Sequence, residues 1–460
     1  MFDDTIAAIA TPLGEGGLAV VRISGAETFA VADKIFLPSG KSSLKPSAAS
    51  THTIHYGKIV RHGETVDEVL LSVLRAPRTF TRENTVEISC HGGILPAKLV
   101  LDTILENGAR LAEPGEFTKR AFLNGRLDLA QAEAVADLIH SRTELALAAA
   151  NEQLAGKLSQ SINQLRDEMM KTLAHIEAHI DFPDEDISPD TKDQLLKRLE
   201  SGVAFMDELL RTANEGQILR RGIRAAIIGR PNAGKSSLLN QLLGHDRAIV
   251  SHIAGTTRDT IEETANIRGL PVVFIDTAGL REARDEIEAE GIRRSRESLA
   301  KAELILHVLD ASEPLTGADE TYLAEFVAKK RIFVLNKIDL PKKLELPETE
   351  PVTRHSSLVT VSCLNGQGME ALKDVIKNLV WAGKIEAGML QVMINSRHQD
   401  ALGRAREATL RTIEALRADL SLELAALDLH IAVNAVGEIV GKTTTEDLLD
   451  SIFSQFCLGK

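Results

Sequence analysis

The stretch GRPNAGKS at residues 229–236 decides the fold of the middle of the chain. It follows an apolar run at residues 225–228 and precedes an apolar helical pattern at residues 237–243, which is the strand–loop–helix context of a phosphate-binding loop. In such a loop, backbone N–H groups turn toward the β-phosphate, Lys235 carries positive charge to the β- and γ-phosphates, and the Ser236 hydroxyl is a Mg²⁺ ligand. We therefore predict a nucleotide-binding loop rather than a glycine-rich structural turn.

Four more continuous apolar runs follow this loop, and each has the length of a short strand. They lie at residues 272–275, 304–309, 332–335 and 358–361. Unbroken apolar runs suit parallel strands that are buried on both faces. We therefore predict a P-loop α/β domain with a mostly parallel sheet, and we assign it to residues 219–382.

The motif NKID, which starts at Asn336, follows one of these runs and predicts selection of guanine. The Asp339 carboxylate can accept hydrogen bonds from the ring N–H and the exocyclic amine of guanine, whereas adenine presents an acceptor at the matching ring position. Asn336 ties the loop to the purine side, and the Lys337 stem can lie over the ring. Ser362 and Cys363 follow the next strand, where GTPases place a small-residue loop against the guanine carbonyl.

Two further motifs predict contacts with Mg²⁺ and the γ-phosphate. Asp276 opens a DTAG motif and can hold Mg²⁺ through water, while the Gly279 N–H can sense the γ-phosphate. The motif GTTRD at residues 255–259 supplies Thr257 as the second hydroxyl of the Mg²⁺ shell. Leu280 stands where many GTPases carry a water-orienting glutamine, so another group must orient the water. A carboxylate among residues 285–288 is one candidate, and a solvated switch helix is the other explanation of that acidic run.

The remaining chain divides into an α+β block and two helical blocks. Residues 1–120 mix short β-rich runs with glycine and proline breaks. Apolar residues from 154 to 180 recur at spacings of three and four, which predicts one stripe on a long helix. A second stripe is predicted to comprise Leu410, Ile413, Leu420, Leu424, Leu427 and Ile431. We predict one helical domain, formed by residues 121–218 and 383–460, into which the α/β domain is inserted; two separate bundles are the alternative.

Composition favours a reduced, cytoplasmic protein. The 460 residues carry a formal net charge of −13, which disfavours non-specific binding of nucleic acid by the whole surface. Three scattered cysteines are too few for a disulfide framework or a four-thiolate metal site. The N-terminus lacks the features of a signal peptide, and no uncharged apolar stretch is long enough to cross a bilayer. We expect no membrane partner.

Taken together, GRPNAGKS, GTTRD and DTAGL resemble the motifs of the MnmE (TrmE) family of tRNA-modification GTPases. The similarity continues at residues 22–25, 90–93, 114–117 and 121–124 and in the terminal FCLGK, so it covers the whole chain. It implies a GTP-hydrolysing enzyme that forms a homodimer through its N-terminal domain. With the FAD protein MnmG, in a heterotetramer-type complex, such an enzyme builds an aminomethyl or carboxymethylaminomethyl group on carbon 5 of the wobble uridine of certain tRNAs.

The resemblance also implies roles for residues of the α/β domain. Asn232 matches a potassium-binding asparagine, and Ser251, Ile253 and Thr256 lie in the segment that encloses that K⁺ ion. Glu288 matches the catalytic glutamate. The complete predicted GTP site is Asn232, Ala233, Gly234, Lys235, Ser236, Ser237, Ser251, Ile253, Thr256, Thr257, Asp276, Thr277, Ala278, Gly279, Asn336, Lys337, Asp339, Ser362 and Cys363, with Mg²⁺ on Ser236 and Thr257.

For the N-terminal domain, the resemblance implies a fold like that of folate-dependent one-carbon enzymes and a bound 5-formyltetrahydrofolate or related folate. Arg22, Glu87 and Lys460 match the folate contacts of the family. Arg126 stands where some members have lysine, which keeps the charge but replaces a point charge by a planar fork. Cys457 matches a terminal cysteine near the one-carbon chemistry, although a buried structural cysteine is the commoner case.

Two other classes of protein compete with this interpretation. A GTP-controlled RNA-binding or ribosome-assembly factor would account for the α/β domain. It would leave Arg22, Glu87 and the CLGK terminus without a function. A folate-dependent one-carbon transferase with a regulatory GTPase domain explains both ends of the chain. This transferase and a tRNA-modification enzyme differ in partner dependence, because the tRNA-modification enzyme needs MnmG and tRNA before any product forms.

Overall fold

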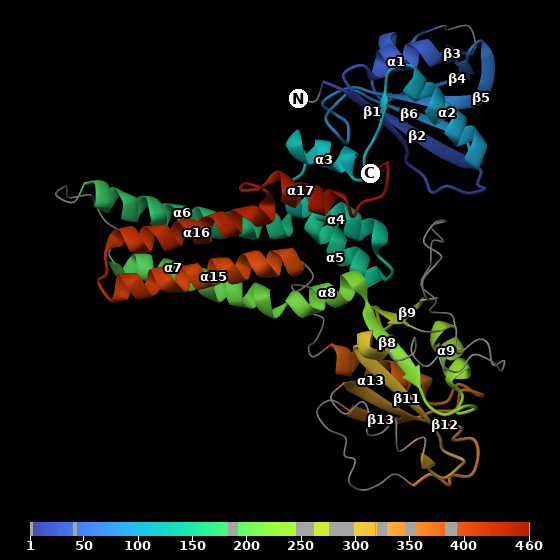
Figure 1. Cartoon of the computed structure of the whole chain (residues 1–460), viewed down its shortest axis with the longest axis vertical. Helices are drawn as coiled ribbons and strands as arrows, with labels where there is room; N and C mark the ends of the chain where they lie inside the picture. Colours follow the sequence, from blue (N-terminus) through green and yellow to red (C-terminus); the bar gives the residue numbers. More distant parts are fainter. Residues whose placement is uncertain are drawn as a thin grey trace.

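The structure, a computed structural model, describes residues 3–39, 44–182, 192–244, 262–275, 299–317, 319, 329–345, 356–381 and 393–459. Figure 1 shows an N-terminal sheet domain, an elongated layer of helices and an α/β domain, with the C-terminal end of the chain lying back beside the N-terminal domain. The predicted fold class is confirmed. The domain boundaries given above remain predictions.

The N-terminal domain is a seven-stranded sheet in the order β3-β4-β5-β6-β2-β1-β7. Neighbouring strands are antiparallel except β1 and β7. Helices α1 and α2 pack on the face that carries Ile23, Leu71 and Ile88, because alternate residues of a strand point to opposite faces. Its elements are β1 (Thr5–Ile9), β2 (Leu18–Gly25), α1 (Thr28–Ile35), β3 (Phe36–Pro38), β4 (Thr53–Arg61), β5 (Glu64–Leu74), β6 (Thr85–His91), α2 (Ile94–Glu106) and β7 (Arg110–Leu111).

The helical layer draws on both halves of the sequence. Its core joins Ile162, Leu173 and Leu199 from the first half to Leu402 and Val436 from the second half. One shared core therefore unites the two helical blocks, as a single interrupted domain requires. Its helices are α3 (Glu116–Leu123), α4 (Leu129–His140), α5 (Glu144–Leu154), α6 (Lys157–Asp181), α7 (Lys192–Arg211), α8 (Ala213–Arg221), α15 (Ser396–Arg417), α16 (Leu422–Val440) and α17 (Glu446–Phe453).

The predicted helical stripes are wrong in two places. The stripe that begins at Leu154 is interrupted, because α5 ends at Leu154 and Gly156 has a left-handed φ of 86° before α6 begins. In the second stripe, α15 ends at Arg417, and the leucines beyond it face away from the core. Leu424 is 53% exposed and Leu427 is 61% exposed. The buried face of α16 consists largely of alanine and valine, since small side chains let α15 and α16 approach closely.

The α/β domain has a six-stranded sheet in the order β13-β12-β11-β8-β10-β9, in which only the β9–β10 pair is antiparallel among the described strands. The prediction of a mostly parallel sheet is confirmed. Its described elements are β8 (Ile223–Ile228), α9 (Lys235–Leu243), β9 (Glu263–Ile267), β10 (Leu270–Phe274), β11 (Leu304–Asp310), β12 (Lys330–Asn336), β13 (Ser356–Thr360) and α13 (Met369–Val380).

A direct contact joins this domain to the helical layer. Ala146 of α5 belongs to the apolar core of the α/β domain. Arg142, just before α5, donates a hydrogen bond from Nη1 to Thr264 Oγ1 at 2.5 Å. Within the described parts of the chain, no helix combines the length and the apolar character needed to cross a membrane.

Candidate functional site

The phosphate-binding loop lies between the end of β8 and the start of α9, as predicted. Gly234 has a left-handed φ of 98°, and a Cβ built there would lie 2.1 Å from Asn336 Nδ2. Only glycine therefore fits at this position. Asn232, Ser236 and Ser237 are exposed, while Ala233 is buried. The first turn of α9 thus lies at an open surface, and the N-terminal end of a helix is a favourable place for an anion.

The Lys235 side chain spans the loop. Its ammonium donates hydrogen bonds to the backbone oxygens of Gly229 at 2.8 Å and Arg230 at 2.9 Å. Partial burial lowers the pKa of Lys235, because desolvation penalises the charged form. A phosphate group bound at this loop would give the ammonium an anionic partner, which binds it more strongly than these neutral carbonyl groups do.

Asn336 connects the phosphate-binding loop to the loop of Ser362 and Cys363. Its Nδ2 donates to the Ala233 backbone oxygen at 2.9 Å, and its Oδ1 accepts from the Cys363 backbone N–H at 3.1 Å. The Asp339 carboxylate accepts from Ser362 Oγ at 2.5 Å. These three loops are far apart in the sequence, yet one buried amide side chain holds them at the same edge of the sheet.

Cys363 acts here as a small neutral group. Burial, with a further contribution from the charge of Asp339, raises the pKa of its thiol to about 11. The thiol is therefore protonated at neutral pH. Its backbone N–H is the group already engaged, through the hydrogen bond to Asn336.

Sequence reasoning missed the partner of Lys337. Lys337 has a φ of 66°, and its Nζ lies 2.6 Å from the carboxylate of Asp310, which ends β11. Burial alone would raise the pKa of Asp310, but hydrogen bonds from Lys337 and Ser312, with the positive charge of Lys337, outweigh it and lower the pKa. An acid directly after the apolar run 304–309 is the sequence signal that could have identified it, because loops at the carboxyl ends of parallel strands form the ligand site.

Part of the predicted nucleotide site lies outside the described residues. This part comprises Ser251, Ile253, Thr256, Thr257, Asp276, Thr277, Ala278, Gly279 and Glu288. The described half contains the triphosphate loop and the guanine loops. The predicted positions of the γ-phosphate sensor, the second Mg²⁺ ligand and the catalytic glutamate belong to the other half.

A second group of predicted residues meets on the N-terminal sheet. Arg22 of β2 and Glu87 of β6 are register partners, and Arg22 Nε donates to Glu87 Oε1 at 2.8 Å. Arg22 Nη1 also donates to the backbone oxygen of Gly459 at 3.4 Å, so the C-terminal tail reaches this point of the sheet. The Arg22 guanidinium lies 5.6 Å from the ring centroid of Phe117. Lys460 lies outside the described residues.

Arg126 follows α3 in the chain and contacts an aromatic ring close to Phe117. Its Nη1 donates to the Thr79 backbone oxygen at 2.6 Å, and its guanidinium lies 5.2 Å from the ring centroid of Phe80. Phe80 and Phe117 pack in one small cluster. Cys457 is exposed in the tail, and its backbone oxygen accepts from the Gly115 N–H at 3.4 Å. The predicted folate residues that are described therefore lie around one cluster, with the tail beside them.

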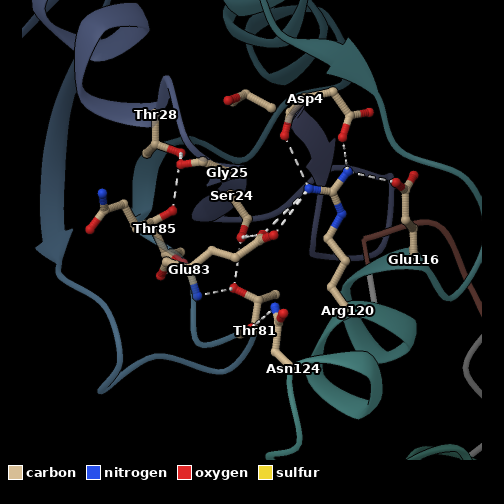
Figure 2. A network of polar contacts seen from close by, with 12 residues as sticks. Asp4, Ser24, Gly25, Thr28, Thr81, Glu83, Thr85, Glu116, Arg120 and Asn124 are labelled. Carbon is tan, nitrogen blue, oxygen red and sulfur yellow. Dashed lines mark hydrogen bonds and ion pairs between the residues drawn. The ribbon is translucent and has the colours of Figure 1, made fainter. Parts of the chain in front are cut away.

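Figure 2 shows a buried charge network in the same domain, which the sequence did not reveal. The Arg120 side chain is fully buried. Its Nη2 lies 2.7 Å from Asp4 Oδ1 and 2.9 Å from Glu116 Oε1, and its Nη1 lies 3.3 Å from Glu83 Oε1. Ser24 donates to Glu83 at 2.8 Å, two residues beyond Arg22 on the same face of β2. The network thus ties α3 to the strand that carries Arg22.

Two family models match most of the chain. The family model "MnmE helical domain" matches residues 129–457, and "GTP-binding protein TrmE N-terminus" matches residues 5–126. The tRNA modification GTPase MnmE of Listeria welshimeri is 48% identical over 458 residues, which cover 99% of each chain. Its counterpart from Geobacillus kaustophilus is 48% identical over 461 residues and is covered to the same extent.

Among solved structures, the G domain of the T. maritima FeoB iron transporter covers 34% of this chain and 98% of that chain, with 24% identity and a TM-score of 0.24. The fold and the loops around Asn336 define the class of protein, a P-loop GTPase. The chain belongs to the MnmE family of tRNA modification GTPases. It is a GTP hydrolase that acts in tRNA modification.

Proposed function

We propose that this protein hydrolyses GTP while, with an FAD-containing MnmG partner, it installs an aminomethyl or carboxymethylaminomethyl group at carbon 5 of the wobble uridine of certain tRNAs. The observation that carries the proposal is the pair of sites on one chain. Asn336 joins the triphosphate loop to the guanine loops, and the C-terminal tail reaches Arg22 on the N-terminal sheet. Such a protein would work in the cytoplasm.

Nucleoside analysis of tRNA tests this function. In cells that lack the protein, we expect the modified wobble uridines to disappear from the affected tRNAs. Re-expression of the native chain should restore them, and expression of a Lys235→Ala variant should not, because the ammonium that balances the phosphate charge is missing. Unchanged nucleosides in the deletion strain would instead favour a GTP-controlled RNA-binding factor without modification chemistry.

In this proposal, the residues of the nucleotide site divide the work. Lys235 and the N-terminus of α9 bind the phosphates, and Asp339 selects guanine.

Two cations complete the proposed site. Ser236, which is exposed at the start of α9, and Thr257 would hold Mg²⁺. Asn232, which is exposed, would hold K⁺ through its amide oxygen together with Ser251, Ile253 and Thr256. Bound beside the phosphates, these cations supply positive charge where negative charge develops. Glu288 would position the attacking water.

Potassium should stimulate GTP hydrolysis, because Leu280 cannot orient water and Asn232 offers an oxygen ligand for a large, weakly hydrated cation. Rates compared in KCl and NaCl at equal ionic strength are expected to be higher in KCl. Asn232→Ala should abolish the difference between the two salts. Equal rates of the native protein in both salts would refute the potassium site.

Glu288→Ala should keep GTP affinity and lose turnover, because the proposed role of the carboxylate is to position the attacking water. Weak GTP binding by this variant would mean that Glu288 is structural.

We also propose that the cluster around Arg22 binds 5-formyltetrahydrofolate or a related folate. Arg22 and Arg126 place two guanidinium groups beside the aromatic rings of Phe117 and Phe80. Two guanidinium groups next to an apolar surface suit a ligand that combines carboxylates with a flat ring system, because the cations can pair with the carboxylates and the ring can pack on the apolar side chains. Glu87 orients Arg22, and Lys460 would add a third positive charge. Cys457 would lie near the one-carbon group.

Arg22→Ala is expected to weaken binding of 5-formyltetrahydrofolate by about 10- to 100-fold, since a hydrogen bond to a charged group contributes about 1.5–3 kcal/mol. Isothermal titration calorimetry of the full chain measures this. Arg61→Ala is the matched control, because Arg61 also sits on a strand of this sheet and pairs with a glutamate, Glu106. Equal affinity of the two variants would place the folate elsewhere.

The homodimer of the proposal has a candidate surface on the sheet face opposite α1 and α2. Tyr56 and Leu70 are register partners on β4 and β5. They are 53% and 45% exposed, and Ile54 beside them is 67% exposed. Exposed apolar side chains on adjacent strands favour burial against another protein surface. Arg22 and Glu87 lie on the same face, so we propose that a second copy packs next to the folate site.

A further inference from the structure

The C-terminal end of α6 carries two histidines whose rings converge. His175 and His179 are four residues apart, so they lie on one side of the helix. Their Nε2 atoms are 3.2 Å apart, and the rings are nearly edge to face at a centroid distance of 4.9 Å. Both side chains are partly buried and partly accessible. Neither histidine belongs to the nucleotide site or to the cluster around Arg22.

We propose that His175 and His179 bind one divalent transition-metal cation through their Nε2 atoms. Two histidines at this spacing on one helix face are an established metal-binding arrangement. Two Zn–N bonds of about 2.0–2.1 Å at a tetrahedral angle place their nitrogens about 3.4 Å apart. A right angle, as in tetragonal Cu²⁺ sites, places them about 2.9 Å apart. The observed separation of 3.2 Å lies between these values, so the rings need little adjustment to chelate one ion.

The hydrogen bond between the two rings does not prevent metal binding. At 3.2 Å, one neutral imidazole donates its Nε2 hydrogen to the other ring. A metal ion takes the place of that hydrogen when both Nε2 atoms act as ligands, and the donor ring then carries its hydrogen on Nδ1 instead of Nε2. This is a change of tautomer, so both rings stay neutral and no net proton is released.

The surroundings favour a cation at this place. His179 lies in the last turn of α6, which ends at Asp181, and the C-terminal end of a helix carries partial negative charge. Two positive groups approach the same side of α6 one to two turns earlier, but Glu168 pairs with both of them, Lys171 at 2.7 Å and Arg198 at 3.4 Å.

The class of ion follows from the donors. Imidazole nitrogen favours Cu²⁺, Zn²⁺ and Ni²⁺ over the oxygen-seeking Mg²⁺ and Ca²⁺. Among the described residues, no group of three or more metal-binding side chains occurs. The pair therefore supplies two ligands, and water fills the remaining positions. Figure 1 places this end of α6 at the tip of the helical layer furthest from the N-terminal sheet, so the ion acts on the helical domain rather than on the nucleotide.

Calorimetric titration of the full-length, metal-free protein with ZnCl₂ and CuCl₂, in excess Mg²⁺ to occupy oxygen-rich sites, tests the proposal. We expect one site, with Cu²⁺ bound more tightly than Zn²⁺. His175→Gln and His179→Gln should each lower the affinity by at least about tenfold, because each removes one of two ligands. The electron paramagnetic resonance spectrum of bound Cu²⁺ should show coupling to two nitrogens in the native chain.

His430→Gln is the matched control. His430 lies on the neighbouring helix α16 and makes an ordinary bond from Nε2 to Glu177 Oε1 at 2.7 Å. This variant should bind metal like the native chain. Thermal unfolding followed by circular dichroism should show that Zn²⁺ raises the melting temperature of the native chain and of this control, but not of the two α6 variants. Binding that survives the loss of either His175 or His179, or that disappears with His430, would overturn the proposal.

Discussion

Asp339→Asn is expected to lower kcat/KM for GTP by about 10²- to 10⁴-fold. The carboxylate can accept two hydrogen bonds from the guanine edge, and hydrogen bonds to a charged group contribute about 1.5–3 kcal/mol each. In the variant, the amide turns an N–H donor toward the exocyclic amine of guanine, which is also a donor. Xanthine carries a carbonyl oxygen at that position, so the variant should gain activity with xanthosine triphosphate. Steady-state hydrolysis of the two nucleotides measures both effects.

The gain with xanthosine triphosphate distinguishes altered selectivity from misfolding, because an unfolded variant gains nothing. Asp374→Asn is a suitable control, since Asp374 lies on α13 of the same domain in an exposed ion pair with Arg268 at 2.7 Å. It should leave the rates with both nucleotides near those of the native chain. Unchanged GTP hydrolysis in the Asp339 variant would show that the base is selected by another group.

Arg120→Met is expected to destabilise the N-terminal domain by about 3–5 kcal/mol. The substitution leaves the buried carboxylates of Glu83 and Glu116 without the fully buried cation that links them to Asp4. Hydrogen–deuterium exchange of the full chain resolves this loss, since amide protection should fall in β1, β2 and α3 while the α/β domain stays protected. Protection equal to that of the native chain in these elements would contradict the assigned role.

Arg110→Met is the matched control, because Arg110 contacts Asp4 and Glu116 as well but is 45% exposed. Solvent screens the Arg110 guanidinium, and Arg120 still pairs with both acids in this variant, so the expected cost is smaller than that of Arg120→Met. The network should also weaken in acid. Burial alone would raise the pKa of Glu116 and of Asp4, but hydrogen bonds from Arg110 and Arg120 outweigh it and lower both. This stabilisation is present above the ordinary carboxyl pKa of about 4 and is lost as the pH falls through the lowered values.

Local spacing made the nucleotide loops predictable. A phosphate-binding loop needs particular residue types over eight consecutive positions, and the strand before it and the helix after it leave their own apolar patterns. The same holds for the motif at Asn336, which follows the β12 run directly. Asp310 was missed because it forms no motif with its neighbours, although it follows an equally clear apolar run.

Periodicity was less reliable in the helical domain. Large apolar residues define a stripe only when they fill the interface between helices. In α16, the buried side chains are mainly alanine and valine, and Leu424, Leu427 and Ile431 lie on the exposed side. At Gly156, one left-handed residue interrupts the helix although the spacing of the apolar residues continues through it. Packing distance and backbone conformation therefore overrode the apolar pattern.

By itself, the sequence determined the GTPase class, the parallel α/β sheet and the family, because these depend on short motifs whose residues act as neighbours in the chain. Only the tertiary structure decided which distant groups meet. Arg22 reaches Gly459 across 437 positions, and Arg120 gathers acids from 4 to 116 positions away. The spacing of His175 and His179 is visible in the sequence, but the convergence of their nitrogens is not. Side-chain direction depends on rotamers and neighbouring helices, which no local pattern encodes.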